Sequence, residues 1–417
     1  MSKKIKNSCI NEFDSTALDE NKAIKLILKS ISGKIDGEIV DIKNSLNRVL
    51  YQNIKSHINI PSFKNSAMDG YAINIKNLKK NNYSLNEIAI SLAGKPYNKK
   101  LKNKETVKVM TGSLIPDNAD AVIMKEMTIS NKKEIKFKKN IKKNQNIRFI
   151  GEDIKKSSIV LKKGTAINHI NLSILSSMGI KKIKVFKKPI ISFFSTGDEL
   201  ISINKKLTKG KIYDSNRYLL HGLLSGLPVI INDMGVVADK ESLIIKKLKE
   251  CEKRSDLIIT TGGVSVGDAD YIRDALNKIG KINFWKISIK PGRPLAYGKI
   301  GKSLFFGLPG NPVSAAVTFE LFVIPAINKI INLKQKNKII IKAKTLSEIQ
   351  KKKGRIEYKR ACLTQNKKGS FVKISGLQGS NILTSLSKAN CYIRLESNIN
   401  FIKKGSMVDV IPFSEEI

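Results

Sequence analysis

The feature that most constrains the fold is an alternation of apolar, strand-like runs with helix-like segments between residues 189 and 330. The runs PIISFFST (189–196), LPVIINDMGVV (227–237), DLIITTGG (256–263), KINFWKISI (281–289) and SLFFGLPG (303–310) are the expected strands. Helices are expected at 217–224, 238–254, 268–280 and 311–330. Since apolar residues run through these strands without polar alternation, both faces should be buried. The pattern predicts a doubly wound α/β domain with a parallel sheet covered on both faces.

The rest of the chain predicts further domains, as expected for 417 residues. Residues 17–32 have apolar side chains at helical spacing, and residues 171–178 resemble a short helix closed by Gly179. Residues 56–146 consist of short strand-like runs and turns. From about residue 335 onward, short strands follow one another closely, which predicts a small β-barrel or sandwich.

The chain is strongly basic, with 76 Lys plus Arg against 35 Asp plus Glu and a net charge of +41. Only nine of the basic residues are Arg, and the 67 Lys are spread along the whole chain. Specific reading of nucleic acid favours Arg on a contiguous face, so a solvated basic surface is the preferred interpretation. No specific nucleic-acid partner is therefore expected.

The sequence also argues against a membrane span, a zinc knuckle and a disulfide framework. No apolar run of about 18 residues is apparent, and the first residues do not resemble a secretory signal. The four cysteines (Cys9, Cys251, Cys362, Cys391) are isolated and form no CxxC pair. We expect no membrane partner and a reducing, cytoplasmic location.

Two loops at strand ends carry the strongest chemical signal. In TTGGVSVGDADY, a strand runs into Gly262, Gly263 and Gly267, and a helix is expected from about Asp268. Such a loop brings backbone N–H groups and a helix N-terminus to an anion. A Walker A loop is excluded because Asp268 and Ala269 replace Lys and Ser/Thr. GLPGNPVSA at 307–315 opens a helix in a similar way, although a rigid turn explains it equally well.

Charged side chains accompany these loops. KPGRP presents Lys290 and Arg293 beside Pro and Gly, with Lys286 a few residues earlier, and this predicts an anion contact. STGDEL places Asp198 and Glu199 after a strand, where they could hold Mg²⁺ or simply begin a helix. No Ser-His-Asp or Cys-His nucleophile is readable.

Three further islands combine Gly with Asp or Glu and contain little Lys. They are SAMDGYAI at 66–73, TGSLIPDNADAVIMKE at 111–126 and RFIGEDI at 148–154. Each alone could be a turn. Together they suggest acidic side chains of a second domain that face a site, in this or a neighbouring subunit.

Eight of these motifs occur in one order, and the chain in that respect resembles the MoeA family. The motifs are MDGYA, TGSLIPDNADAV, IGEDI, STGDEL, IYDSN, TTGGVSVGDADY, KPGRP and GLPGNPVSA. That family comprises molybdopterin molybdenumtransferases, with the gephyrin E domain as an animal relative. The resemblance covers the chain from about residue 16 to its end. It implies four domains: an elongated helical domain (1–55 and 147–187), an inserted β-rich domain (56–146), a molybdopterin-binding α/β domain (188–334) and a C-terminal β-barrel (335–417).

The resemblance also implies an activity: the insertion of molybdenum from molybdate into adenylylated molybdopterin with release of AMP. It implies Mg²⁺ as cofactor, a homodimer with the active site shared between subunits, and the molybdopterin adenylyltransferase as upstream partner. Two alternatives remain, a scaffold protein and a protein that only binds a pterin. The intact acidic islands favour the enzyme over both.

Site residues follow from motif matches, position by position. The implied catalytic residues are Asp69, Thr111, Asp153, Glu199, Asp239, Asp270, Lys286 and Lys290. The implied cofactor-binding residues are Gly262, Gly263, Ser265, Gly267, Asp268, Arg293, Pro309, Gly310, Asn311, Pro312, Ser314, Arg360 and Ser380. Glu199 and Asp270 are the expected metal ligands, although the sequence leaves open which carboxylate holds the metal.

Overall fold

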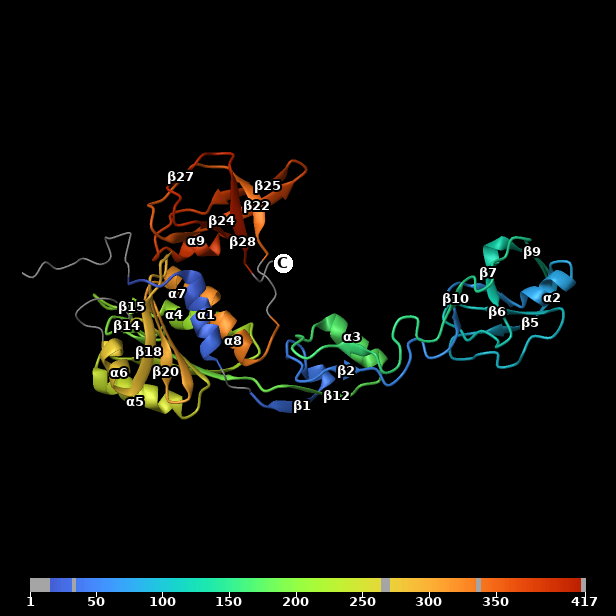
Figure 1. Ribbon diagram of the computed structural model, residues 1–417, viewed down its shortest axis with the longest axis horizontal. Helices are drawn as coiled ribbons and strands as arrows, with labels where there is room; N and C mark the ends of the chain where they lie inside the picture. The colour runs from blue at the N-terminus through green and yellow to red at the C-terminus, as the bar shows by residue number, and fades with distance from the viewer. Residues whose placement is uncertain (1–15, 32–34, 264–270, 335–338, 414–417) are drawn as a thin grey trace, which may run out of the picture. The chain divides into compact units, whose positions relative to one another are not determined.

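A computed structural model describes residues 16–31, 35–263, 271–334 and 339–413 (Figure 1). The chain forms two compact units. Unit 1 comprises Met1–Glu38, Asn47–Val49 and Val185–Ile417, and unit 2 comprises Ile39–Leu46 and Leu50–Lys184. The finer boundaries of the four expected domains stay a prediction.

Unit 1 is built on a six-stranded sheet of order β16-β13-β17-β21-β20-β18. The strands are β13 (Ile190–Thr196), β16 (Ile230–Val237), β17 (Leu257–Thr261), β18 (Gly280–Lys286), β20 (Pro294–Ile300) and β21 (Ser303–Leu308). β16, β13, β17 and β21 are mutually parallel, as expected. The expectation of a wholly parallel sheet was wrong, because β20 runs antiparallel to both neighbours. A tight turn at Gly301 joins β20 directly to β21, and two residues leave no room for a crossover helix.

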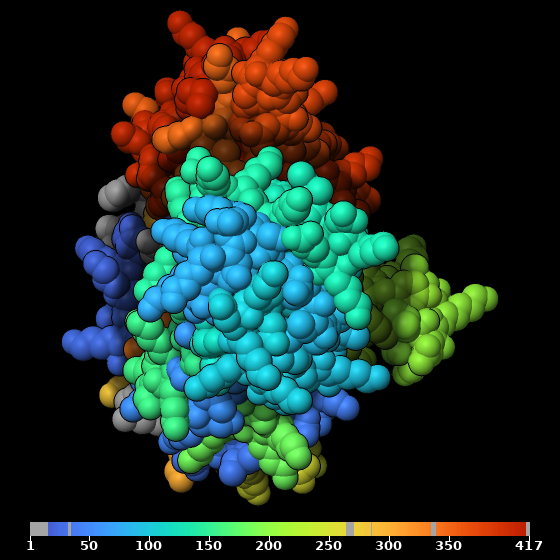
Figure 2. Space-filling view, turned by 90° about the vertical axis from the view of Figure 1, so that its right-hand side faces the viewer, coloured from blue at the N-terminus to red at the C-terminus, as the bar shows by residue number. Residues whose placement is uncertain are grey.

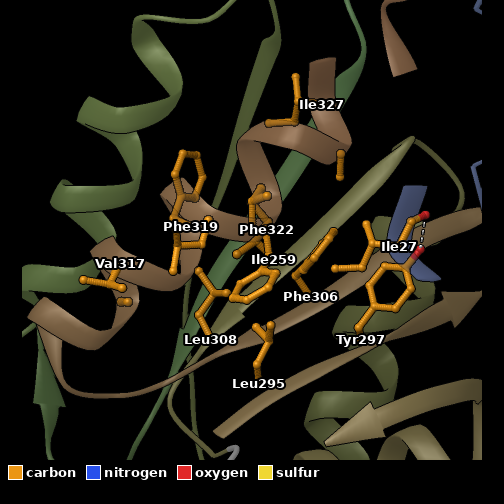
Figure 3. Packing of buried hydrophobic residues seen from close by; sticks show 14 of the residues in the cluster. Ile27, Ile259, Leu295, Tyr297, Phe306, Leu308, Val317, Phe319, Phe322 and Ile327 are labelled. Carbon is orange, nitrogen blue, oxygen red and sulfur yellow. Dashed lines mark hydrogen bonds between the residues drawn. The ribbon is translucent and has the colours of Figure 1, made fainter. Parts of the chain in front are cut away.

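Helices cover both faces of this sheet. One face packs against α1 (Glu20–Ser30), α4 (Ser215–Ser225) and the helical run Pro312–Ile330, and the other against α5 (Glu241–Glu252) and α6 (Tyr271–Ile279). Neighbouring strand residues point to opposite faces: Phe306 packs with the first group (Figure 3), and Phe305 packs with the second. Continuous apolar strands were therefore a correct sign of burial on both sides.

The helix predicted at 17–32 is shorter than expected. α1 begins at Glu20 because Asp19 caps it, accepting hydrogen bonds from the backbone N–H groups of Asn21 (3.0 Å) and Lys22 (3.2 Å). Glu20 is itself buried, and both of its carboxylate oxygens lie 2.8 Å from the hydroxyl of Tyr358. This contact ties α1 to the C-terminal part of unit 1.

The segment Pro312–Ile330 is helical throughout, as α7 (Pro312–Thr318), the π-helical turn η3 (Phe319–Val323) and α8 (Ile324–Ile330). By length and composition alone it could cross a membrane, so the expectation that no apolar stretch is this long was wrong. Of its most apolar window, 72% is buried inside the protein, with Phe319 and Phe322 in the core (Figure 3). That burial is typical of the core helix of a globular domain.

The C-terminal strands form a closed five-stranded barrel in the order β24-β25-β22-β28-β26, closed by pairing of β26 with β24. These are β22 (Ile341–Thr345), β24 (Ile356–Asn366), β25 (Gly369–Ile374), β26 (Cys391–Leu395) and β28 (Met407–Pro412). Of the two expected architectures, the barrel is therefore correct. The short strand β19 (Ile289–Lys290) joins β24 in parallel, and β23 (Ile349–Gln350), β27 (Phe401–Ile402) and α9 (Leu383–Ser387) complete this part. A two-stranded β14 (Leu200–Ile201) and β15 (Ile212–Tyr213) ribbon precedes α4.

Unit 2 contains a second six-stranded sheet, of order β7-β4-β6-β5-β9-β8. Its strands are β4 (Gly70–Ile73), β5 (Ser84–Ser91), β6 (Glu105–Val109), β7 (Ala121–Met124), β8 (Thr128–Asn131) and β9 (Glu134–Phe137), with α2 (Ile75–Lys80) and the 3-10 turn η2 (Lys125–Met127). The remaining elements are β1 (Gly37–Asp41), η1 (Ile42–Asn44), β2 (Ile54–Lys55), β3 (Asn65–Ser66), β10 (Ile147–Arg148), β11 (Ile159–Leu161), α3 (His169–Ser177) and β12 (Lys182–Phe186). Figure 2 shows the surface of unit 2 in blue to green. The strand-rich prediction for 56–146 is confirmed.

Candidate active site

The candidate site of unit 1 lies where the parallel strands end. Thr196 of β13 is level with Val237 of β16, and Thr261 of β17 is level with both Ser195 and Leu308. The loops that follow these four strands therefore start at one edge of the sheet. This is the edge at which open α/β sheets bind ligands.

Glycines let these loops approach one another closely. Gly262 has φ +84°, and a Cβ there would lie 2.3 Å from the carbonyl oxygen of Thr196. A Cβ on Gly310 would lie 3.6 Å from the Cα of Gly262, so the backbones of the two loops face each other with no side chain between them. Gly263, with φ +61°, would meet the hydroxyl of Thr196 at 2.8 Å. The loop backbones therefore pack closely at these three glycines, which together are called the glycine cradle below, and their role in binding an anion stays a prediction.

Four of the expected site residues, Ser265, Gly267, Asp268 and Asp270, lie outside the described residues. Their roles stay predictions.

An acidic corner occupies the ends of β13 and β16. Asp198 accepts a hydrogen bond from the backbone N–H of Asp239 (3.1 Å), and Glu199 folds back over Gly197. Burial raises the pKa of the Asp239 carboxyl, and the negative charges of Asp198 and Glu199 raise it further. Among the described residues no three His, Cys, Asp or Glu side chains converge as a ready-made metal site. The clustered negative charge nevertheless suits a cation that completes its shell with ligand oxygens, as Mg²⁺ does.

A basic corner lies toward the other side of the same edge. Lys286 ends β18 in register with Pro294, the first residue of β20. Lys290 lies beside β24, where its Nζ is 3.5 Å from the carboxylate of the buried Glu357. Lys359 donates to the same carboxylate at 3.0 Å. One buried carboxylate thus holds two ammonium groups in place.

The turn between these cations packs against the core helix. A Cβ on Gly292 would lie 2.6 Å from Thr318 and 3.6 Å from the carbonyl oxygen of Ser314 on α7. Only a glycine fits here, and its φ of +104° is also one that other residues rarely adopt. The contact fixes the position of Arg293, the next residue, relative to α7.

The barrel contributes a loop that Arg360 holds in place. Arg360 is 1% exposed, and its guanidinium donates to the carbonyl oxygens of Leu377 (3.0 Å), Gln378 (3.2 Å) and Gly379 (3.0 Å) and to Ser385. Burial lowers the pKa of this guanidinium. Ser380 directly follows Gly379 in this loop, and its backbone carbonyl oxygen accepts a hydrogen bond from the N–H of Val313 in the first turn of α7 (3.1 Å). Arg360 therefore shapes the loop that delivers Ser380, and its direct contact with a ligand stays a prediction.

These loops surround a hollow of about 350 Å³. Of the expected residues, it is lined by Glu199, Gly262, Gly310, Asn311 and Pro312. The lining also includes residues that were not assigned to the site from the sequence: Thr196, Asp214, Asn216, Thr261 and Asn381. Asp214 and Asn216 could have been predicted from the YDSN motif at 213–216, which follows STGDEL closely in the sequence. Pro309 is buried at the end of β21, and Lys286, Lys290 and Arg293 lie outside the lining.

In unit 2 the structure brings Asp69 and Thr111 together. The carboxylate of Asp69 accepts hydrogen bonds from the backbone N–H (2.7 Å) and the hydroxyl (2.8 Å) of Thr111. These bonds hold the pKa of the Asp69 carboxyl below its ordinary value, and Lys125 and Lys108 lower it further. The Asp69 side chain is thus fixed, ionised and exposed.

Asp153, the third expected residue of unit 2, lines a hollow of about 530 Å³ with Asn65, Arg148 and Glu152. Its backbone N–H donates to the carbonyl oxygen of Ile60 (3.0 Å). The amide oxygen of Asn65 is buried and has no hydrogen-bond partner in the part of the chain that the structure describes. Asn65 and Arg148 were not assigned from the sequence, although Arg148 lies inside the island at 148–154 and Asn65 directly precedes the island at 66–73.

Comparison with known proteins covers nearly the whole chain. Residues 18–179 match the MoeA N-terminal region (domain I and II), residues 192–329 match a probable molybdopterin binding domain, and residues 342–413 match the MoeA C-terminal region (domain IV). A molybdopterin molybdenumtransferase of Haemophilus influenzae is 39% identical over 397 residues, which is 94% of this chain and 98% of that protein. A protein of the same name from Staphylococcus epidermidis is 32% identical over 96% of this chain and 98% of its own length.

A solved structure agrees with these matches. The crystal structure of the molybdopterin biosynthesis moeA protein from Pyrococcus horikoshii superimposes with a TM-score of 0.83 at 30% identity. It covers 95% of this chain and 100% of the solved chain. Sequence and fold therefore point to the same set of relatives.

Proposed function

The chain belongs to the MoeA family, and we propose from this that it is a molybdopterin molybdenumtransferase of molybdenum cofactor biosynthesis. In the proposed reaction the enzyme binds molybdate and adenylylated molybdopterin. Water attacks the pyrophosphate link, which releases AMP and leaves the other phosphate on molybdopterin, while the two dithiolene sulfurs replace oxygen atoms of molybdate, which leave as water. Molybdenum remains on the dithiolene sulfurs. Cleavage needs no protein nucleophile, only positioning and stabilisation of charge.

The observation that carries this proposal is the order of chemical groups along the sheet edge. Acidic groups follow β16 and β13, the glycine cradle follows β17 and β21, and the cations lie at β20 and β18. With strands about 4.8 Å apart, the edge extends over about 24 Å. An extended substrate with a pyrophosphate at its middle has the length and the charge pattern to lie along such an edge.

The cations have the simplest role. Molybdate and the pyrophosphate are anions, and Lys286, Lys290 and Arg293 supply positive charge at one end of the edge. Glu357 keeps the Lys290 ammonium in place at 3.5 Å, so the cation does not have to be ordered by the substrate. Ser380 lies in the barrel loop that adjoins the first turn of α7, and Arg360 of β24 holds that loop through hydrogen bonds to its carbonyl oxygens.

Magnesium is part of the proposal. Glu199, with Asp270, would hold it near the glycine cradle, and Asp198 and Asp239 add negative charge beside it. When bound, the ion neutralises phosphate charge and polarises the bond to be broken. The acidic corner supports this assignment because its carboxylates already repel one another without a cation.

The residues of unit 2 enter through a homodimer. Asp69, Thr111 and Asp153 are the expected catalytic residues of that unit, and the resemblance assigns them to the site of the other subunit. Two hydrogen bonds from Thr111 hold the Asp69 carboxylate in one position although it is exposed and not part of the core, and this supports a role toward a partner subunit.

The cell context follows from the proposed reaction. The molybdopterin adenylyltransferase would supply the substrate, and the cytoplasm would hold both proteins. The cysteines Cys251 and Cys362 are free thiols, which fits a reducing compartment.

The deciding experiment incubates the purified protein with adenylylated molybdopterin, molybdate and Mg²⁺ and measures AMP. We expect AMP release that depends on both molybdate and Mg²⁺. Tight binding without AMP release would instead support the pterin-binding or scaffold alternative.

Matched lysine variants sharpen this test. Lys290→Met removes a cation of the proposed site, whereas Lys342→Met removes a lysine paired with Asp409 on the barrel. We expect AMP release to be lost in the first and kept in the second. Equal activity of both variants would remove Lys290 from the mechanism.

Subunit mixing tests the dimer. Asp69→Ala and Glu199→Ala subunits should each be inactive, and mixing them should restore part of the activity because one site of a mixed dimer is intact. A fully active monomer in sedimentation would exclude the shared site.

A further inference from the structure

A buried carboxylate of the barrel lies next to Lys290. Glu357 belongs to β24, and its side chain is 7% exposed. The backbone at this point is paired on both sides, in parallel with β19, where Lys290 is level with Glu357, and antiparallel with β26, where Leu395 is level with Glu357. Because both neighbouring strands fix Glu357, its carboxylate has a defined position relative to the turn that carries Lys290.

Two lysines share this carboxylate unequally. Lys359 follows two residues later on β24, on the same face of the strand, and its Nζ lies 3.0 Å from Oε1 of Glu357. The Nζ of Lys290 lies 3.5 Å from the same oxygen. A charge-assisted hydrogen bond has a length of about 2.7–2.9 Å, so Lys359 is the closer partner. The side chain of Lys359 is 11% exposed and that of Lys290 is 46% exposed, so only Lys290 has ready access to a ligand.

The three side chains, called the Glu357 trio below, carry one negative and two positive charges. When Lys290 turns to an anion, Glu357 and Lys359 still form a neutral buried pair. Without Lys359, the same movement would leave the buried carboxylate with neither lysine, and breaking a buried ion pair is strongly unfavourable. Lys359 therefore makes the Lys290 ammonium available to a ligand.

We propose that Glu357 is a positioning residue that holds the Lys290 ammonium in place, and that Lys359 keeps Glu357 neutral when Lys290 moves to an oxyanion. The inference rests on the proposed function, which assigns Lys290 to the anionic substrates. A lysine side chain is a flexible four-carbon stem, and an anion that must order this stem binds less tightly. Glu357 orders the stem beforehand, and the contact of 3.5 Å is loose enough for the ammonium to be transferred.

A charge-matched variant separates positioning from the effect of net charge. Glu357→Gln/Lys359→Met removes one negative and one positive charge, so the trio keeps its net charge and neither buried charge is left behind. If the trio acts through its net charge only, the affinity for molybdate stays the same. We expect it to fall about 3- to 10-fold, because the anion must now order Lys290. Lys342→Met removes an exposed lysine of the same barrel and should bind molybdate as the wild type does.

The same double substitution in a Lys290→Met background shows whether the effect passes through Lys290. This background keeps the close pair of Glu357 and Lys359, so its buried charges stay matched. We expect the double substitution to cause no further loss of molybdate affinity there. Glu357→Asp is a second, milder variant in the wild-type background. It keeps the charge but shortens the side chain by one carbon, and it should also weaken binding.

Calorimetric titration of the full-length protein with molybdate measures these affinities, and thermal unfolding measures the stability of each variant. Wild-type affinity in both the charge-matched variant and Glu357→Asp overturns the inference, even with a loss of stability, since the trio would then only join β19 to β24. An equal loss in the Lys290→Met background overturns it as well, and so does a wild type that does not bind molybdate. Failure of the wild type to release AMP, with the expected affinities intact, would overturn the proposed reaction and leave the positioning role standing.

Discussion

Replacing Gly262 by alanine is expected to damage both the fold and the site, for a reason that can be worked out from its backbone. Its φ of +84° is a conformation that costs other residues about 1–2 kcal/mol. The new Cβ would lie 2.3 Å from the carbonyl oxygen of Thr196, whereas real Cβ contacts are essentially never below 3.0 Å. The carbonyl must therefore retreat by at least 0.7 Å.

That movement occurs at the end of β13 and carries the next loop with it. Thr196 is followed by Gly197 and then by Asp198 and Glu199 of the acidic corner. Relieving such a clash in packed structure costs about 1–3 kcal/mol. We expect a total loss of about 2–5 kcal/mol in the free energy of unfolding, measured by urea denaturation, and loss of AMP release.

Two other glycines serve as matched controls. Gly222 lies within α4 with open space around its Cβ position, so Gly222→Ala should stabilise the protein by about 0.5–1 kcal/mol. At Gly310 the Cβ would make an ordinary contact of 3.6 Å with Gly262, so the fold should tolerate alanine, but the methyl group enters the cradle and should weaken substrate binding. A Gly262→Ala protein with wild-type stability and activity would refute the reasoning, as would equal destabilisation by Gly310→Ala.

Three further predictions follow from contacts elsewhere. Tyr358→Phe should lower the free energy of unfolding by about 1.5–3 kcal/mol in denaturant titration, because Glu20 loses its buried donor, whereas Tyr218→Phe at the surface should have no effect. Thr111→Val should raise the pKa of the Asp69 carboxyl toward its ordinary 3.8 in an NMR titration, because the hydroxyl donor is lost. Since the folded-state pKa of Asp69 is lowered, its ionised form stabilises the fold above pH 3.8, and this stabilisation is lost as the pH falls. A pKa that does not change in Thr111→Val would contradict the hydrogen-bond assignment. Binding to duplex DNA should be sequence-blind and lost between about 50 and 200 mM salt, and a salt-resistant, selective complex would overturn the interpretation of the +41 charge.

Much of the fold was predictable because local patterns and long-range packing agree. The continuous apolar runs of β13, β17 and β21 predicted burial on both faces, and the structure has helices on both. β20 was not predicted as a strand because it contains polar and small residues and no continuous apolar run. Its antiparallel direction depends on the two-residue turn at Gly301. The helix at 17–32 was overextended because periodicity does not mark the cap at Asp19.

The candidate site was predictable only as far as each motif reveals its own chemistry. Gly262 and Gly310 stood out because glycines at strand ends predict close backbone approach, and the structure has it. Asp214 and Asn216 did not stand out, since Asp and Asn at a helix start are ordinary caps. Their difference from ordinary caps is an unpaired buried oxygen on each, which depends on side-chain contacts that a motif does not encode.

The order of the motifs along the edge is a property of the sheet and not of the sequence. β16 follows β13 in the chain but forms the edge of the sheet next to β13. The loop after β16 therefore joins the acidic corner on the side away from the glycine cradle. β18 precedes β20 and β21 yet lies beyond both, which moves Lys286 to the far end. β13 and β20 are three strand intervals apart, about 14 Å, and this exceeds the screening length of about 8 Å at physiological salt. The two corners therefore do not neutralise each other, and the edge keeps a polarity that can orient a substrate with a pyrophosphate between two different ends.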